Sequence, residues 1–107
     1  MTTTLTPIEQ KTLVLNAVDE FLDFMNSRPN TFLGEKYELT GGRKYLRIST
    51  PASVHCFVDA VTGDVYMAAS VAKPMLNGAR YNLLDADSFA LLKERWDPFG
   101  SYLYKRR

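Results

Sequence analysis

The sequence of 107 residues predicts an α+β fold, an N-terminal helix packed on a three- or four-stranded antiparallel meander with a shorter C-terminal helix. Three observations lead to this prediction. Apolar residues recur every three or four positions between residues 7 and 27, they alternate every second position between residues 37 and 69, and the helical spacing returns after residue 85. The length suits a single domain over residues 1–107, with residues 1–5 and 104–107 expected to be disordered.

The first helix is expected from Pro7 to Ser27. Thr6 is suited to cap its N-terminus, Pro7 to occupy the first helical position and Glu9 to complete a capping box. Pro29 predicts the end of the helix, since the residue before a proline disfavours helical geometry.

The apolar surface of this helix is wider than one sheet requires. Its apolar positions span about 200°, whereas a helix lying on a sheet needs about 100°. Leu13, Leu15 and Phe24 widen the arc on both sides. We therefore expect part of this surface to contact another element or a partner subunit, with Leu15, Leu22 and Phe24 as candidate interface residues.

Four strands are expected next, at residues 37–40, 44–49, 54–59 and 65–69. Gly41-Gly42 and residues 60–64 supply the tight turns of a sequential antiparallel meander. In the central strands, Ile48 and Val58 belong to the face that should cover the helix, while Arg47 and Phe57 belong to the opposite face.

The stretch from residue 70 to 84 has no sustained period and predicts a loop, with a short extended piece at residues 80–83. Asp85 or Asp87 can then cap a second helix. Phe89, Leu92 and Trp96 fall on one stripe of that helix, and the following proline and glycine end it.

Composition indicates a soluble protein of a reducing compartment, and we expect it in the cytoplasm. The single cysteine, Cys56, excludes an internal disulfide, and no signal peptide or membrane span is expected. Residues 1–40 hold six acidic and three basic side chains, whereas residues 41–107 hold six acidic and ten basic ones. This asymmetry predicts either a surface with two oppositely charged faces or charges that interleave in the folded chain.

Catalytic chemistry is not expected, and neither is a cofactor or a metal. His55 and Cys56 are neighbours on a strand and point to opposite faces, so they cannot act together as base and nucleophile. Cys56 is better interpreted as a buried core residue. Asp19 and Asp23 share a helix face, but two carboxylates alone bind hard cations weakly and are more typical of a solvated surface.

One sheet face combines aromatic and basic residues, a pattern that can stack bases and bind phosphates. The C-terminal tail adds further basic residues. The candidate nucleic-acid-binding residues are Arg43, Lys44, Tyr45, Arg47, Phe57, Tyr66, Lys105 and Arg106. The alternative is that residues 70–84 and the tail cover this face.

The segment Val54-His55-Cys56-Phe57-Val58-Asp59, together with residues 62–66 and 79–83, resembles a stretch of small uncharacterised proteins of tailed bacteriophages. The resemblance covers about residues 54–83. It implies a viral protein made in the cytoplasm of a bacterial host, and it carries no known activity or site residue.

The sequence thus leads us to expect a non-enzymatic accessory protein, encoded by a phage, that self-associates and acts by binding a macromolecular partner. Aromatic and exposed apolar residues mark such interfaces. Besides the candidates on the first helix, we expect contacts from Tyr102, Leu103 and Tyr104 in the tail. The alternative function is that of a nucleic-acid-binding module.

Overall fold

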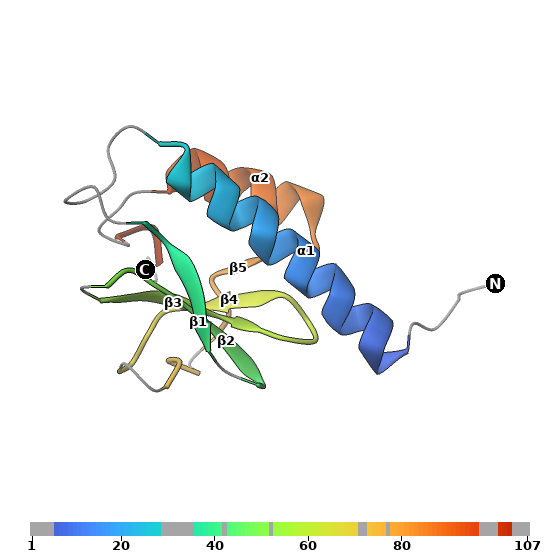
Figure 1. Cartoon of the computed structure of the whole chain (residues 1–107). Helices are drawn as coiled ribbons and strands as arrows, with labels where there is room; N and C mark the ends of the chain where they lie inside the picture. The colour runs from blue at the N-terminus through green and yellow to red at the C-terminus, as the bar shows by residue number, and fades with distance from the viewer. Residues whose placement is uncertain are drawn as a thin grey trace.

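The computed structural model describes residues 6–28, 36–41, 43–51, 53–70, 73–76, 78–96 and 101–103. Two helices, α1 (Pro7–Asn26) and α2 (Ala86–Arg95), lie side by side on one face of an antiparallel sheet (Figure 1). The α+β fold expected from the sequence is confirmed. Within the described residues, no helix is long and apolar enough to span a membrane.

The capping box predicted for α1 is present. The Thr6 hydroxyl accepts a hydrogen bond from the Glu9 backbone N–H at 3.1 Å, and the Glu9 carboxylate accepts one from the Thr6 N–H at 3.2 Å. Both groups satisfy helix-end N–H donors that have no partner within the helix. The helix ends at Asn26, with Ser27 as its C-cap.

Within the described residues, the sheet has five strands in sequential order: β1 (Glu38–Gly41), β2 (Tyr45–Ser49), β3 (Val54–Asp59), β4 (Asp64–Tyr66) and β5 (Tyr81–Asn82). The meander is longer than the three or four strands expected, because the extended piece predicted at residues 80–83 joins the sheet, where Tyr81 pairs with Val65. The fourth strand also stops at Tyr66, short of the predicted residue 69. Beyond it, Ala68 bridges to Pro74, so the chain turns back before it returns as β5.

The core lies between α1 and the sheet. Val14, Val18, Phe21 and Met25 are fully buried along one stripe of the helix. They belong to the same cluster as the inward residues of the central strands, of which Ile48, Cys56, Val58 and Val65 are fully buried. The predicted inward face of the sheet is thus confirmed.

The second helix begins at the predicted cap. The Asp85 carboxylate accepts hydrogen bonds from two backbone N–H groups of the first turn, at 3.0 and 3.2 Å. Phe89 packs edge-on against Phe21 of α1 at a centroid distance of 6.1 Å, and Lys93 forms an ion pair with Glu20 at 3.3 Å. These contacts fix α2 beside the second half of α1.

The end of the chain corrects one expectation. Tyr102 and Leu103 lie in a short 3-10 helix, η2 (Ser101–Leu103), and both are buried in the core. Their backbone carbonyls accept hydrogen bonds from the Tyr81 hydroxyl at 3.3 Å and from Nε of Arg80 at 2.6 Å. They are therefore not exposed interface residues. Tyr104, Lys105 and Arg106 lie outside the described residues.

Candidate functional site

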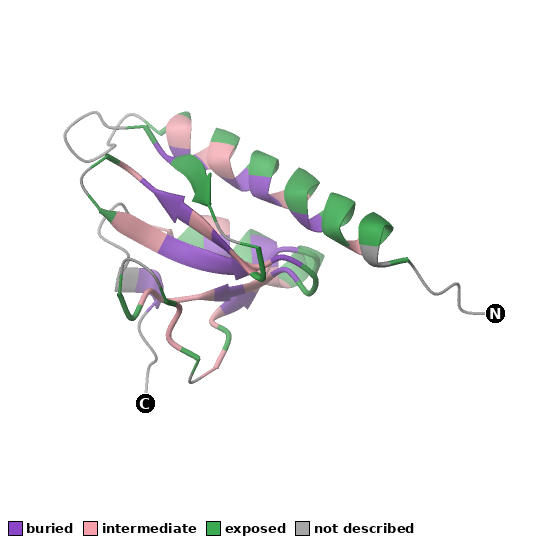
Figure 2. Cartoon of the chain, turned by 60° about the horizontal axis from the view of Figure 1, so that its bottom comes forward, coloured by how far each residue is buried: buried purple, intermediate pink, exposed green. Residues whose placement is uncertain are grey.

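The N-terminal half of α1 extends past the sheet and is mostly exposed (Figure 2). Ile8 is 78% exposed and Leu15 is 42% exposed. Leu22 follows at the same seven-residue interval and is partly buried against the core. A seven-residue spacing returns close to the same side of a helix, so these three residues form one stripe, which we call the α1 stripe. Two of the predicted interface residues, Leu15 and Leu22, belong to it.

Phe24, the third predicted interface residue on this helix, takes a different role. Its ring packs edge-on against Trp96 at 6.0 Å, and the guanidinium of Arg28 lies 4.4 Å from its centroid. Phe24 therefore helps to connect α1 to the end of α2. The surplus apolar surface of the helix is divided among this internal contact, the α1 stripe and Leu13, which is 43% exposed and lies away from that stripe.

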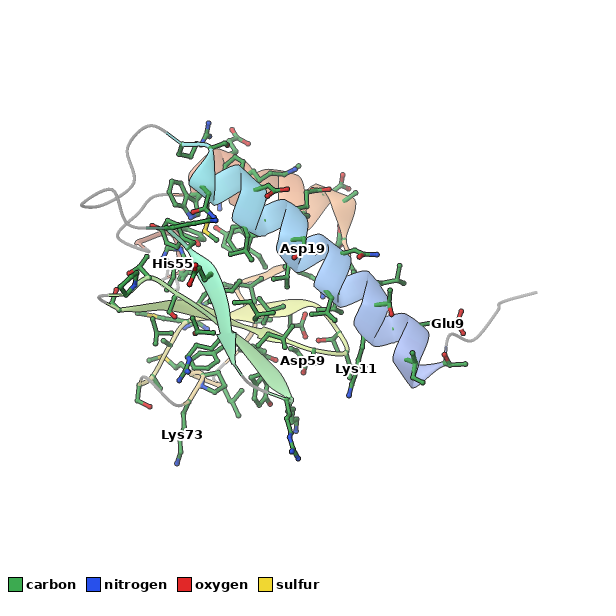
Figure 3. All side chains as sticks on the ribbon, in the orientation of Figure 1. Glu9, Lys11, Asp19, His55, Asp59 and Lys73 are labelled. Atoms are coloured by element: carbon green, nitrogen blue, oxygen red, sulfur yellow. The ribbon has the colours of Figure 1, made fainter. Side chains whose placement is uncertain are left out.

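An open groove with a volume of about 570 Å³ runs between the second half of α1 and β1. Leu22 and Leu39 supply its apolar surface, and Asp19 projects from the middle turns of α1 above the sheet (Figure 3). The described lining residues carry three acidic groups and one basic group, so the groove is acidic. They are Asp19, Leu22, Asp23, Asn26, Lys36, Tyr37, Glu38 and Leu39.

An amide side chain in the lining of this groove bonds the backbone as a neighbouring strand would. Nδ2 of Asn26 donates to the Tyr37 carbonyl at 3.0 Å, and Oδ1 of Asn26 accepts from the Tyr37 N–H at 2.8 Å. Both backbone groups of one residue are thus bonded by one side chain. This is the pattern that a paired strand would otherwise provide.

The next position along this edge is Leu39. Alternate residues of an antiparallel strand direct their N–H and C=O to the same side, so the amide groups of Leu39 follow those of Tyr37 along the outer edge. Leu39 pairs with the buried Ile48, which places its side chain on the face that carries α1. A bulge at Thr40 then ends the regular pairing. Within the described residues, β1 is an edge strand of the sheet.

The opposite sheet face is partly covered, which corrects the expected open aromatic surface. Phe57 is only 3% exposed and cannot stack on a base. Tyr45 and Tyr66 remain half-buried and pack edge-on at 5.9 Å, with the Lys44 ammonium 5.5 Å from the Tyr45 ring. Arg43 is exposed, while the Arg47 side chain bonds the hydroxyl and carbonyl of Thr40.

Acidic groups on the same face oppose phosphate binding. Asp59 pairs across the strands with Tyr45, and Asp64 precedes β4's Val65 and Tyr66. Burial raises the pKa of Tyr66, and the nearby charge of Asp64 raises it further. The negative potential that stabilises the neutral phenol would repel a nucleic-acid backbone.

His55 and Cys56 do not form a catalytic pair. Cys56 is fully buried, and burial raises the pKa of its thiol, so the thiol stays protonated. Nε2 of His55 is hydrogen-bonded to the Tyr102 hydroxyl at 2.6 Å. The imidazole also packs against Tyr37 at 5.1 Å and Trp96 at 6.2 Å, so it connects β3 to the C-terminal segment. Nε1 of Trp96 is buried, and it has no hydrogen-bond partner among the residues that the structure describes.

No group of three potential metal ligands occurs within the part of the chain that the structure describes. The Asp19 and Asp23 carboxylates, which share a helix face as expected, both line the groove. The sequence predicted that these two carboxylates share a helix face, but it did not predict the groove. The strand that completes it is brought to the helix by the Asn26–Tyr37 contact, and no local pattern predicts that contact.

The fold defines a small α+β domain that, within the described residues, exposes apolar side chains along one helix and carries β1 at one edge of its sheet. Residues 5–105 match DUF7717, a family of unknown function, and the chain belongs to this family. The comparisons with curated proteins and with solved structures gave no match.

Proposed function

We propose that this protein is a non-enzymatic interaction protein that self-associates through the α1 stripe and acts by binding a macromolecular partner. The observation that carries the proposal is the exposure of Ile8 and Leu15 on a helix whose start is held by a capping box. An apolar side chain on a frayed helix end would have no fixed position. Here the two side chains are presented at a defined spacing.

The free energy of self-association would come from burial of apolar side chains of α1. Covering a Leu or Ile side chain completely contributes about 1.5–3 kcal/mol. Two α1 helices packed against each other would cover Ile8 and Leu15 from both copies, four side chains in all. The gross gain is several kcal/mol, from which the cost of association is subtracted, so we expect a weak dimer that forms only at high micromolar concentration or above.

Light scattering after size-exclusion chromatography tests self-association across a wide concentration range. The wild type should move from monomer towards dimer as concentration rises, and the double variant Ile8→Gln/Leu15→Gln should remain monomeric. The matched control is Leu76→Gln, which changes a side chain that is 61% exposed outside α1. A wild type that stays monomeric up to near-millimolar concentration would disprove self-association.

Two further parts of the proposal rest on other observations. The resemblance of residues 54–83 to small proteins of tailed bacteriophages supports a phage origin, and with it a site of action in the cytoplasm of a bacterial host. The engagement of His55 by Tyr102 and the burial of Cys56 support a role without catalysis.

Nucleic-acid binding is the second candidate, and the contact of Lys44 with the Tyr45–Tyr66 pair is the observation that favours it. Fluorescence anisotropy with short single- and double-stranded DNA and RNA tests it. Binding that weakens steeply with salt and is lost in Tyr45→Ala would support this candidate. No binding at low salt would remove it.

A further inference from the structure

We propose that the groove between α1 and β1 binds an extended basic peptide segment of a partner protein, which adds to the sheet as a strand beside β1. The proposal goes beyond self-association through the α1 stripe and does not depend on it. It rests on three independent features of the groove: an edge strand, an apolar surface and an acidic wall.

The edge strand supplies the backbone contacts. Asn26 already bonds the N–H and C=O of Tyr37, which shows that this edge accepts strand-like hydrogen bonds in the folded chain. The amide groups of Leu39 are next along the same edge. An added strand would lie about 4.8 Å from β1 and would pair with Leu39, beside the contact that Asn26 makes at Tyr37.

The side chains of the added strand would alternate between the two faces of the sheet. Those on the helical face enter the groove, where Leu22 and Leu39 form an apolar surface and Leu39 is 38% exposed. Asp19 and Asp23 project from the facing side of α1, one helical turn apart. A segment with a central apolar residue flanked by lysines or arginines at alternate positions fits this arrangement.

The charge of the groove also argues against a second copy of this chain as the occupant. If two β1 strands paired edge to edge, each groove, with three acidic residues against the single Lys36, would bring a net negative surface towards the same surface of the other copy. Like charges at a contact oppose association. A basic segment of another protein has the complementary charge.

The test uses a fluorescent peptide as the probe, acetyl-Lys-Thr-Val-Thr-Lys-Thr-amide, titrated with the full chain. We expect saturable binding by anisotropy in the micromolar to low-millimolar range, with shifts of the β1 amide signals in NMR spectra. The same peptide with glutamate in place of lysine should not bind. Absence of saturable binding by the lysine peptide would overturn the proposal.

Two changes isolate the backbone contact. Methylating the valine nitrogen of the peptide removes a strand hydrogen bond without altering the protein, and it should lower affinity about tenfold. Proline is tolerated on an edge strand, so we expect Leu39→Pro to fold. It removes the outward N–H and should abolish binding, while Leu39→Val keeps this N–H and should retain binding. Equal binding of the methylated and unmethylated peptides would refute strand addition, even if Leu39→Pro failed to fold.

Two further measurements test the contribution of the acidic residues to binding and whether a second copy of the chain occupies the edge. Asp19→Asn and Asp23→Asn should each weaken binding about threefold, as expected for exposed ion pairs, whereas Glu94→Gln, an exposed acid of α2 outside the groove, should not. If the β1 amide signals shift with protein concentration alone, a second copy occupies the edge and the proposal is wrong. Light scattering on the same samples reports self-association separately.

Discussion

Replacing Asn26 by alanine should test how the groove is held together. The Asn26 amide makes two hydrogen bonds to the backbone of Tyr37, at 3.0 and 2.8 Å, and both are partly buried. They join the last turn of α1 to the segment that leads into β1, across eleven positions of sequence. Asn26→Ala removes both bonds and leaves the Tyr37 N–H and C=O without these partners.

The expected loss of stability follows from the two bonds. Each contributes about 1 kcal/mol net, and a backbone group left unsatisfied in a partly buried site adds to the cost. We expect Asn26→Ala to lower the free energy of unfolding by about 2 kcal/mol. For a domain of this size the melting temperature should fall by about 8–15 °C. Urea unfolding followed by Trp96 fluorescence measures it, because Trp96 packs against Tyr37 at 5.9 Å.

Ser27→Ala is the matched control, because Ser27 also makes a side-chain hydrogen bond at the end of α1, but to an exposed carbonyl of its own helix. It should cost well under 1 kcal/mol. Asn26→Asp separates the two bonds, since a carboxylate can accept from the Tyr37 N–H but cannot donate to its carbonyl. If Asn26→Ala were as stable as Ser27→Ala, water would replace the amide at no cost and the strand-like anchor would be refuted.

Two other predictions concern the helix cap and the sheet face. Thr6→Ala should lower the free energy of unfolding by about 1 kcal/mol in thermal denaturation, because it removes the capping-box acceptor, while Thr12→Ala within the helix should cost less. A loss in Thr6→Ala no larger than in Thr12→Ala would show that the cap is unimportant. Tyr66 has a pKa above its ordinary value, from burial and then from Asp64, so the native state retains the phenol proton longer than the unfolded state. Its contribution to stability is therefore complete below the ordinary tyrosine pKa and is lost as the pH rises through the native pKa. The difference in alkaline absorbance titration between the wild type and Tyr66→Phe measures this, and Asp64→Asn should move the native pKa back towards the ordinary value. An unchanged titration in Asp64→Asn would exclude the carboxylate as a cause.

The elements of the fold that local chemistry determines could be predicted from the sequence. The capping box at Thr6 and the Asp85 cap each depend on side chains within three residues of the helix start. The alternation of residues 45–49 and 54–59 likewise identified the inward face of β2 and β3. Each of these signals is strong because one short stretch of sequence contains the whole pattern, whether a cap and its partner or an alternation of apolar residues.

The parts that were mispredicted depend on contacts between distant residues. The extended piece predicted at residues 80–83 is present, but its pairing with Val65 as a fifth strand was not predicted, because its two strand residues carry no periodicity. Tyr102 was predicted to be an exposed aromatic residue of the tail. In the structure its hydroxyl is hydrogen-bonded to His55, and its carbonyl accepts a hydrogen bond from the Tyr81 hydroxyl. Only the three-dimensional arrangement supplies these partners, so composition alone suggested exposure.

The acidic character of the candidate site could be predicted from the sequence, whereas its edge strand could not. The acidic excess of the first forty residues is partly gathered at the groove, where Asp19, Asp23 and Glu38 come together. The sequence therefore indicated an acidic surface on the first helix. It could not indicate that an edge strand lies below that surface, because the strand is positioned by the Asn26–Tyr37 contact.

The two halves of α1 are suited to different kinds of binding. The second half is fixed by Phe21, Met25 and the Asn26 anchor, so the groove beside it keeps one shape and can select a peptide by charge and spacing. The first half extends past the sheet, and its exposed apolar residues Ile8 and Leu15 can pack against another helix without disturbing the core. The α1 stripe connects the two halves through Leu22, which also lines the groove. A self-associated protein would then present two grooves in a fixed relation, and a partner with two basic segments would bind it more tightly than either segment alone.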